Sequence, residues 1–126
     1  MRTSLWVGEQ PQALDLGAMA LAGFALAGVT LALAPAIDWC LLVLAVLAWD
    51  IGAGLVSNAT AATREAWRRH ASKSDRYGFM ISHLTVYPIV LYWLASGDLV
   101  LTGLVCAFLL AKVILFISGQ RPHWIR

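Results

Sequence analysis

The side chains of this sequence with the greatest chemical potential are three ionisable groups set in apolar surroundings. Asp50 lies in LAWDIGAGLVSNAT (47–60), His83 in YGFMISHLTVYP (77–88) and Lys112 in FLLAKVILF (108–116). A carboxylate, an imidazole and an ammonium can exchange protons, bind ions or pair with one another. Ionisable groups inside membrane segments mark functional sites often enough to be treated as site hypotheses.

Asp50 begins a polar strip with helical spacing. Asp50, Gly54 and Asn58 recur every four positions, and Ala53 and Ser57 fall on the same helix face. Polar groups that face lipid are costly, so the strip is expected to face the interior of a helix bundle. Its small residues leave room beside the carboxylate for a neighbouring helix, water or a ligand.

The elements that must position these groups are membrane-spanning helices. The chain has 126 residues, of which 60% are hydrophobic and 13% charged, and a mean hydropathy of +0.75. Soluble domains carry about 25% charged residues. Four apolar segments, each near the ~20 residues that a bilayer helix needs, lie at about 13–34, 37–58, 77–96 and 99–118. The sequence therefore predicts an all-α polytopic membrane protein, with one four-helix domain over residues 1–126.

The distribution of positive charge predicts the orientation in the membrane. The loop at about 60–76 holds five of the nine Lys and Arg residues, the N-terminal arm holds Arg2, and the tail holds Arg121 and Arg126. The two short connections between spans hold none. By the positive-inside rule, both termini and the basic loop are expected to be cytoplasmic, in a multi-pass protein of the plasma (inner) membrane.

The expected partners follow from the same pattern. The bilayer is one, and a second copy or a larger membrane complex is another, because four short spans scarcely enclose a pathway. No nucleic-acid partner is expected, since the basic cluster is short and lies between apolar spans. Arg64, Arg68 and Arg69 could instead bind lipid head groups, if the second helix continues beyond Asn58 as a basic amphipathic extension. The alternative is that these arginines only set the topology.

The three ionisable groups are expected at similar depth. With a rise of ~1.5 Å per residue, Asp50 lies roughly 12 Å, and His83 and Lys112 each roughly 9 Å, from the cytoplasmic helix ends. They could pair in one layer of low dielectric. Lys112 could alternatively snorkel to the interface, and His83 could be a neutral core histidine. Asp50 is too deep and too short to snorkel.

Pro88 predicts an irregularity in the third helix. It lacks an N–H, so the carbonyl of Leu84 loses its usual partner and a kink is expected beside His83 and Tyr87.

Aromatic residues near the predicted helix ends fit an interfacial belt: Trp6, Trp39, Trp67, Tyr77, Tyr92, Trp93 and Trp124. Trp49 lies deeper than a belt residue should.

Metal and cofactor chemistry has little support. Two histidines and a carboxylate could form a metal site from His70, His83, His123, Asp50 and Asp75, but no HxxxH or HExxH spacing is present. Only His83 is deep enough for haem. No cofactor or metal is therefore expected, and Cys40 and Cys106 are expected to be free thiols in apolar runs.

Three functional hypotheses remain open. In the first, the chain is a subunit of a small-solute or ion-coupled transporter, with the solute or ion bound by Asp50, Asn58, His83, Tyr87 and Lys112. In the second, it is a membrane enzyme acting on a lipid or other amphiphile at the cytoplasmic leaflet, with Asp50 and His83 as the catalytic acid and base. In the third, it is a structural subunit whose polar groups lock helix packing.

Overall fold

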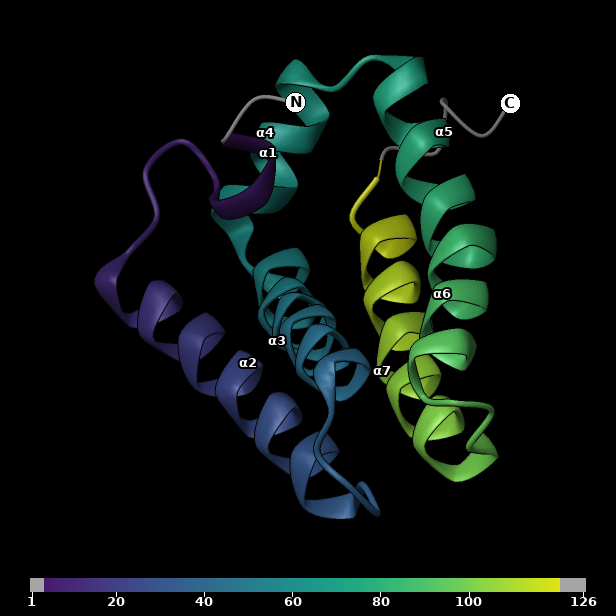
Figure 1. Cartoon of the computed structure of the whole chain (residues 1–126). Helices are drawn as coiled ribbons and strands as arrows, with labels where there is room; N and C mark the ends of the chain where they lie inside the picture. The colour runs from purple at the N-terminus through teal and green to yellow at the C-terminus, as the bar shows by residue number, and fades with distance from the viewer. Residues whose placement is uncertain (1–3, 121–126) are drawn as a thin grey trace.

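The chain folds into an all-helical bundle, and the computed structural model describes residues 4–120 (Figure 1). Four of its helical segments are long and apolar enough to cross a membrane, which confirms the predicted fold class. The helices are α1 (Ser4–Val7), α2 (Ala13–Leu33), α3 (Trp39–Ala59), α4 (Ala61–His70), α5 (Lys73–Ile81), α6 (Tyr87–Leu94) and α7 (Leu99–Ser118). A π-helical turn, η1 (Ser82–Val86), joins α5 to α6, so Lys73–Leu94 forms one continuous span.

Side chains next to the helix starts explain where the spans begin. The Asp38 carboxylate accepts a hydrogen bond from the Leu41 amide at 2.8 Å at the start of α3, and Asp98 caps α7 in the same way. Such caps satisfy amide groups that have no partner within the helix. The third span starts at Lys73, four residues before the predicted Tyr77, because Ser72 and Asp75 form a reciprocal capping box.

The predicted continuation of the second helix into the basic loop is wrong. Helix α3 ends at Ala59, and Thr60 has an extended backbone with φ −74° and ψ 145°. The Thr60 hydroxyl accepts a hydrogen bond from the Thr63 amide at 3.3 Å and starts a separate helix, α4. Thr60 therefore ends α3 and caps α4, so the arginines of α4 do not continue the helix face of α3.

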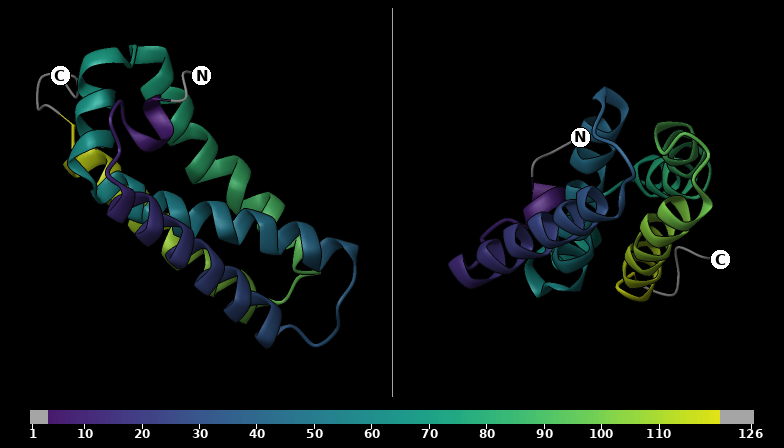
Figure 2. Two further views of the ribbon diagram at one scale, coloured as in Figure 1. Left: turned by 90° about the vertical axis from the view of Figure 1, so that its left-hand side faces the viewer. Right: turned by 60° about the horizontal axis from the view of Figure 1, so that its bottom comes forward.

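The spans form two antiparallel pairs around a central α3. Helix α2 packs along α3, α6 packs along α7, and α3 contacts α7 between the two pairs (Figures 1 and 2). Helices α1 and α4 lie at the same end of the bundle as the C-terminal end of α7. We call this the basic end, because the segment 60–76 carries five Lys and Arg residues. The opposite end, with the connections at 34–38 and 95–98, is the hairpin end.

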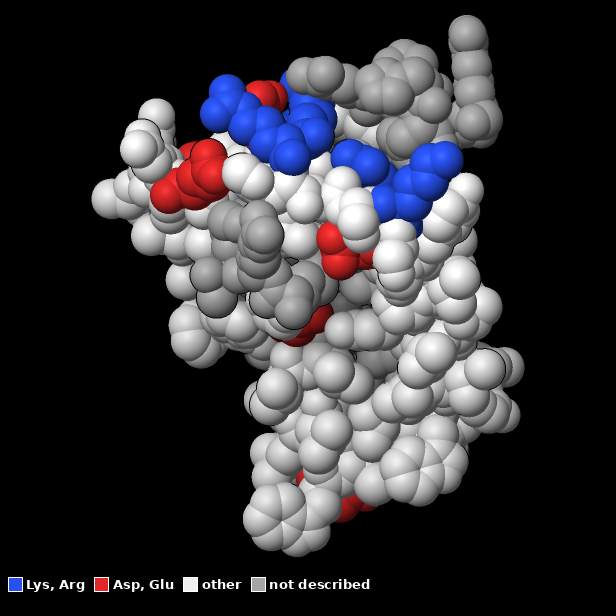
Figure 3. Space-filling view, turned by 90° about the horizontal axis from the view of Figure 1, so that it is seen from above, with Lys and Arg blue, Asp and Glu red and all other residues white. Residues whose placement is uncertain are grey.

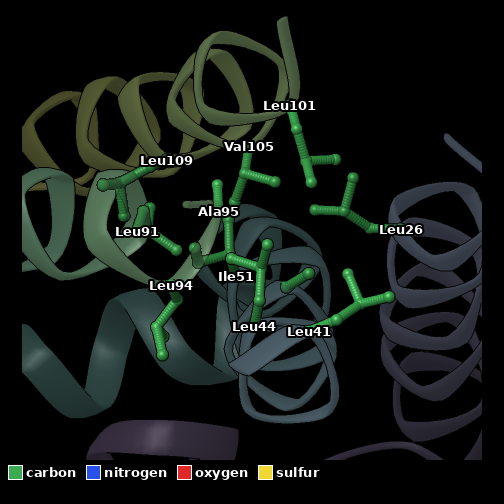
Figure 4. Packing of buried hydrophobic residues seen from close by; sticks show 11 residues of the cluster. Leu26, Leu41, Leu44, Ile51, Leu91, Leu94, Ala95, Leu101, Val105 and Leu109 are labelled. Carbon is green, nitrogen blue, oxygen red and sulfur yellow. The ribbon is translucent and has the colours of Figure 1, made fainter. Parts of the chain in front are cut away.

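The interior of the hairpin half is filled by apolar side chains. Leucine, isoleucine, valine and alanine side chains from α2, α3, α6 and α7 point toward one another there (Figure 4). The cluster comprises Leu26, Leu41, Leu44, Ala48, Ile51, Leu91, Leu94, Ala95, Leu101, Val105 and Leu109. Dispersion contacts of this kind hold membrane helices together where burial from water supplies little drive.

Glycines allow α2 and α3 to approach closely. A Cβ on Gly52 would lie 2.6 Å from the carbonyl oxygen of Ala22, and one on Gly23 would lie 2.8 Å from the indole nitrogen of Trp49. Trp49 also packs edge-on against Phe24, with ring centroids 6.0 Å apart. This contact explains why a tryptophan lies deeper than an interfacial belt.

Gly52→Ala is expected to destabilise the protein by about 1–3 kcal/mol, because the added methyl group meets rigid backbone rather than a movable side chain. The measurement is unfolding in mixed micelles of increasing denaturing-detergent fraction. Gly28→Ala is the matched control, since a Cβ there has nothing within 4 Å. Equal stability of the two variants would contradict the close α2–α3 contact.

Candidate functional site

An ion pair joins the two spans that carry the most deeply placed charges. The Lys112 Nζ of α7 lies 3.6 Å from the Asp50 Oδ2 of α3, and the Tyr87 hydroxyl of α6 donates to the same oxygen at 3.4 Å. The Lys112 side chain is 7% exposed, so it does not snorkel to the interface. The structure thus brings together Asp50, Lys112 and Tyr87, three of the predicted site residues, from three helices.

Gly54 makes room for the lysine. A Cβ on Gly54 would lie 2.5 Å from the Lys112 Cε and 2.6 Å from its Nζ, so the lysine stem crosses α3 at this glycine. The space predicted beside the carboxylate is therefore partly filled by Lys112. The aromatic face of Phe79 adjoins the ammonium on another side, with its ring centroid 5.7 Å from Nζ.

His83 stands in a stack of aromatic rings along the third span. Its ring centroid lies 3.9 Å from that of Phe79 and 4.6 Å from that of Tyr87, with interplanar angles of 19° and 15°. Its Nδ1 lies 2.7 Å from the Phe79 carbonyl oxygen. A carbonyl only accepts, so Nδ1 carries the hydrogen of the neutral ring. The buried Nε2 then presents a lone pair, and it has no hydrogen-bond partner among residues 4–120.

The π-helical turn explains how His83 fits there. The Tyr87 amide donates to the Ser82 carbonyl, five residues back, immediately before Pro88. The predicted irregularity is therefore a wider turn ahead of the proline that leaves the span continuous. The His83 ring bonds to the Phe79 carbonyl rather than lying beside a freed Leu84 carbonyl. Turns of this type are frequent at functional sites.

The remainder of the polar strip holds the basic end together. The Asn58 amide donates to the Gly54 carbonyl at 2.8 Å, within its own helix. The Ser57 hydroxyl bonds to the Trp6 carbonyl of α1 and lies 3.0 Å from the Thr63 hydroxyl of α4. Short polar side chains at the end of α3 therefore fix both short helices.

A cavity of about 480 Å³ occupies the interior of the basic half. It lies between α3 and the α5–η1–α6 span, with α1 forming part of its wall. Its polar lining comprises Asp50, Ser57, Asn58, Ser74, Asp75, Ser82, His83, Tyr87 and Lys112, and its aromatic lining comprises Trp6, Trp49, Trp67, Phe79 and Tyr87. Ligand pockets commonly measure about 300–1,000 Å³ and combine apolar walls with a few polar groups. All five predicted solute-binding residues line this cavity.

The three predicted head-group arginines lie elsewhere. Arg64 Nε donates to the Asn58 carbonyl at 3.0 Å, Arg68 Nε to the Gly119 carbonyl at 2.9 Å, and Arg69 Nε to the Glu65 carboxylate at 2.6 Å. None of the three lines the cavity. Arg64 and Arg68 therefore connect α4 to the ends of α3 and α7, whereas Arg69 pairs within α4.

Sequence reasoning missed the contribution of α1 and of two tryptophans. Trp67, placed in the interfacial belt by its position, is instead 2% exposed, and its Nε1 donates to the Leu5 carbonyl at 2.7 Å. Trp6 lines the cavity, and α1 lies against α4. The amphipathic pattern LWV at residues 5–7 was the only available signal, and it is too short to indicate a docked helix.

The described residues contain no group of three or more His, Cys, Asp or Glu side chains that could hold a metal ion. His123 lies outside the described residues. The His70 Nε2 contacts the Glu9 carboxylate at the basic end, and Cys40 and Cys106 are free.

Comparison with known protein families, with curated proteins and with solved structures gives no significant match to this chain. The geometry of the cavity is therefore the feature of the molecule that bears on its function.

Proposed function

We propose that this integral membrane protein binds an amphiphile whose polar head enters the cavity from the basic end. The observation that carries the proposal is the cavity itself: about 480 Å³, walled by aromatic rings, with Asp50, Lys112 and His83 in its lining. An amphiphile matches both parts of this lining, because its chain fits aromatic walls and its head group can bond to the polar groups. We place the basic end at the cytoplasmic face by the positive-inside rule.

The apolar core argues for a one-sided site. Ile51, next to Asp50 in sequence, is fully buried in the cluster that fills the hairpin half. The layer of Asp50 and Lys112 thus forms the floor of the cavity, and the apolar cluster lies beyond it. A transport function would require a path built with further copies of the chain or with another subunit.

An enzymatic function is the second candidate, favoured by His83. Its unpartnered Nε2 could accept a proton from a bound head group, while its Nδ1 remains fixed by the Phe79 carbonyl. A general base needs such a fixed ring with one free nitrogen in reach of its substrate. The Asp50 carboxylate, by contrast, already contacts the Lys112 ammonium and the Tyr87 hydroxyl.

A purely structural function accounts for only part of the geometry. The contacts of Asp50 with Lys112 and Tyr87 do join three spans. Polar contacts that only stabilise helix packing need no cavity, and a close-packed polar layer would stabilise the packing more. The open space beside the pair favours binding.

Binding can be tested by fluorescence, because Trp6, Trp49 and Trp67 line the cavity. In phosphatidylcholine nanodiscs, a spin-labelled single-chain amphiphile is expected to quench this emission saturably, in addition to the linear quenching caused by partition into lipid. Gly78→Leu should remove the saturable component, since Gly78 lines the cavity and has space for a side chain.

Gly103→Leu is the matched control for that experiment. Gly103 is also a helical glycine with nothing within 4 Å of an added Cβ, but it lies outside the cavity lining. The proposal fails if quenching by the wild type is only linear, or if both leucine variants change it equally.

A further inference from the structure

The polar groups of the cavity also indicate the chemical class of the head group. We propose, on the basis of the binding function above, that the head group is an acidic oxyanion, a phosphate monoester or a carboxylate. Its oxygens accept hydrogen bonds from the Lys112 ammonium, and it shares an acidic hydrogen with the His83 Nε2.

The Lys112 ammonium has N–H groups available to donate to a ligand. An ammonium carries three N–H donors, and the contact of Nζ with Asp50 Oδ2 measures 3.6 Å. Good charge-assisted hydrogen bonds between nitrogen and oxygen are shorter, about 2.7–2.9 Å. The contact with Asp50 is therefore longer than a good hydrogen bond, and an oxyanion in the cavity could form a shorter bond to the same ammonium.

His83 supplies the second, independent indication. The side chain is 7% exposed, lines the cavity, and has a buried Nε2 without a partner among the described residues. A buried polar nitrogen left unpaired is costly. A carboxylic acid or a phosphate monoester can donate an O–H to Nε2, or accept an N–H after the proton has moved to the ring. A quaternary ammonium head can do neither.

The charge at the basic end favours anions over cations. Segment 61–76 has five Lys and Arg residues and two acidic residues, Glu65 and Asp75, and Glu9 lies against His70 at the same end. Figure 3, which looks down on this end, shows Lys and Arg side chains gathered across the upper part of the view, with Asp and Glu side chains beside them. Asp75 also lines the cavity, but its carboxylate accepts hydrogen bonds from the Ser72 amide and hydroxyl at 2.8 and 2.9 Å. A basic surface raises the local concentration of anions and lowers that of cations.

In this site Asp50 competes with the ligand for the Lys112 ammonium. The competition predicts that Asp50→Asn strengthens the binding of an anionic amphiphile. A site for cations predicts the opposite, because the carboxylate would then bind the ligand. The asparagine side chain has nearly the same shape and can still accept from Tyr87 and Lys112, so the variant is expected to fold.

The experiment compares four probes on wild-type protein in phosphatidylcholine nanodiscs: dodecyl phosphate, dodecanoate, dodecyltrimethylammonium and inorganic phosphate. Binding is read as displacement of the spin-labelled amphiphile by each probe, which restores the saturably quenched tryptophan emission, and Gly78→Leu should lack this signal. Both anionic amphiphiles are expected to bind at least about tenfold more tightly than the cationic one. Asp50→Asn should tighten their binding about fivefold or more, and the double variant Asp50→Asn/Lys112→Met should abolish the preference for anions.

The outcomes separate this inference from the binding function on which it rests. Tighter binding of dodecyltrimethylammonium, or weaker anion binding by Asp50→Asn, would overturn the oxyanion assignment and leave amphiphile binding intact. If none of the amphiphiles binds saturably, both proposals fail. If inorganic phosphate binds as tightly as dodecyl phosphate, the oxyanion site is supported, and a free anion replaces the lipid head group as its ligand.

Discussion

Replacing Lys112 by methionine is expected to lower the free energy of unfolding by about 2–4 kcal/mol. Methionine has a similar length and is apolar, so the stem can still pack across Gly54. The cost comes from Asp50, which keeps only the Tyr87 hydroxyl, at 3.4 Å, as its partner among residues 4–120. Loss of one partner from a fully buried pair costs about 3–5 kcal/mol. The Asp50 side chain is 27% exposed, which lowers the expected value.

The double variant Asp50→Asn/Lys112→Met separates charge from packing. It removes both charges, so its stability is expected to recover most of what Lys112→Met loses. Interaction energies between residues in contact are measured by such cycles. The measurement is unfolding in mixed micelles, with Asp50→Asn and wild type completing the cycle. Additive losses in the double variant would contradict the ion pair.

This pair also shows how much the sequence could predict. A carboxylate, a lysine and a histidine on three spans at similar calculated depth indicated one polar layer, and Asp50 and Lys112 do meet. Depth along a helix follows from the rise per residue, so it can be counted from a sequence. Rotation about each helix axis, which decides which residues touch, depends on packing between helices. Sequence spacing therefore predicted the layer but not that Tyr87 bonds to Asp50 while His83 stacks on Phe79.

The four spans were predictable for a simpler reason. A bilayer demands long apolar helices, and their composition and length appear directly in the sequence. The structure of the basic end was harder to predict from the sequence, because individual hydrogen bonds between segments distant in the chain hold it together. Ser57 bonds to Trp6, and Trp67 bonds to Leu5, across 51 and 62 residues. No local pattern encodes such pairings, and Thr60, which separates α3 from α4, fits a helix extension equally well by composition.

Trp67→Ala is expected to cost about 3–5 kcal/mol, because it empties the centre of the basic end. The Trp67 ring meets the rings of Phe79 and Phe116 edge-on, with centroids 5.5 and 4.8 Å away, and so joins α4 to α5 and α7. Its indole N–H also holds α1 through the Leu5 carbonyl. Loss of the side chain removes both the packing and this hydrogen bond, so α1 is expected to detach from the cavity wall.

Two controls distinguish this role from a general effect of tryptophan loss. Trp93 on α6 is 71% exposed, so Trp93→Ala should change stability little. Trp67→Phe retains an aromatic ring and loses the N–H, so it should cost about 1 kcal/mol or slightly more. Hydrogen exchange of the α1 amides reports the second effect directly: it should accelerate strongly in Trp67→Ala, less in Trp67→Phe, and remain unchanged in Trp93→Ala. Unchanged α1 exchange in Trp67→Ala would mean that Ser57 and the contact between Glu9 and His70 suffice to hold the segment, and that the cavity wall does not depend on the tryptophan.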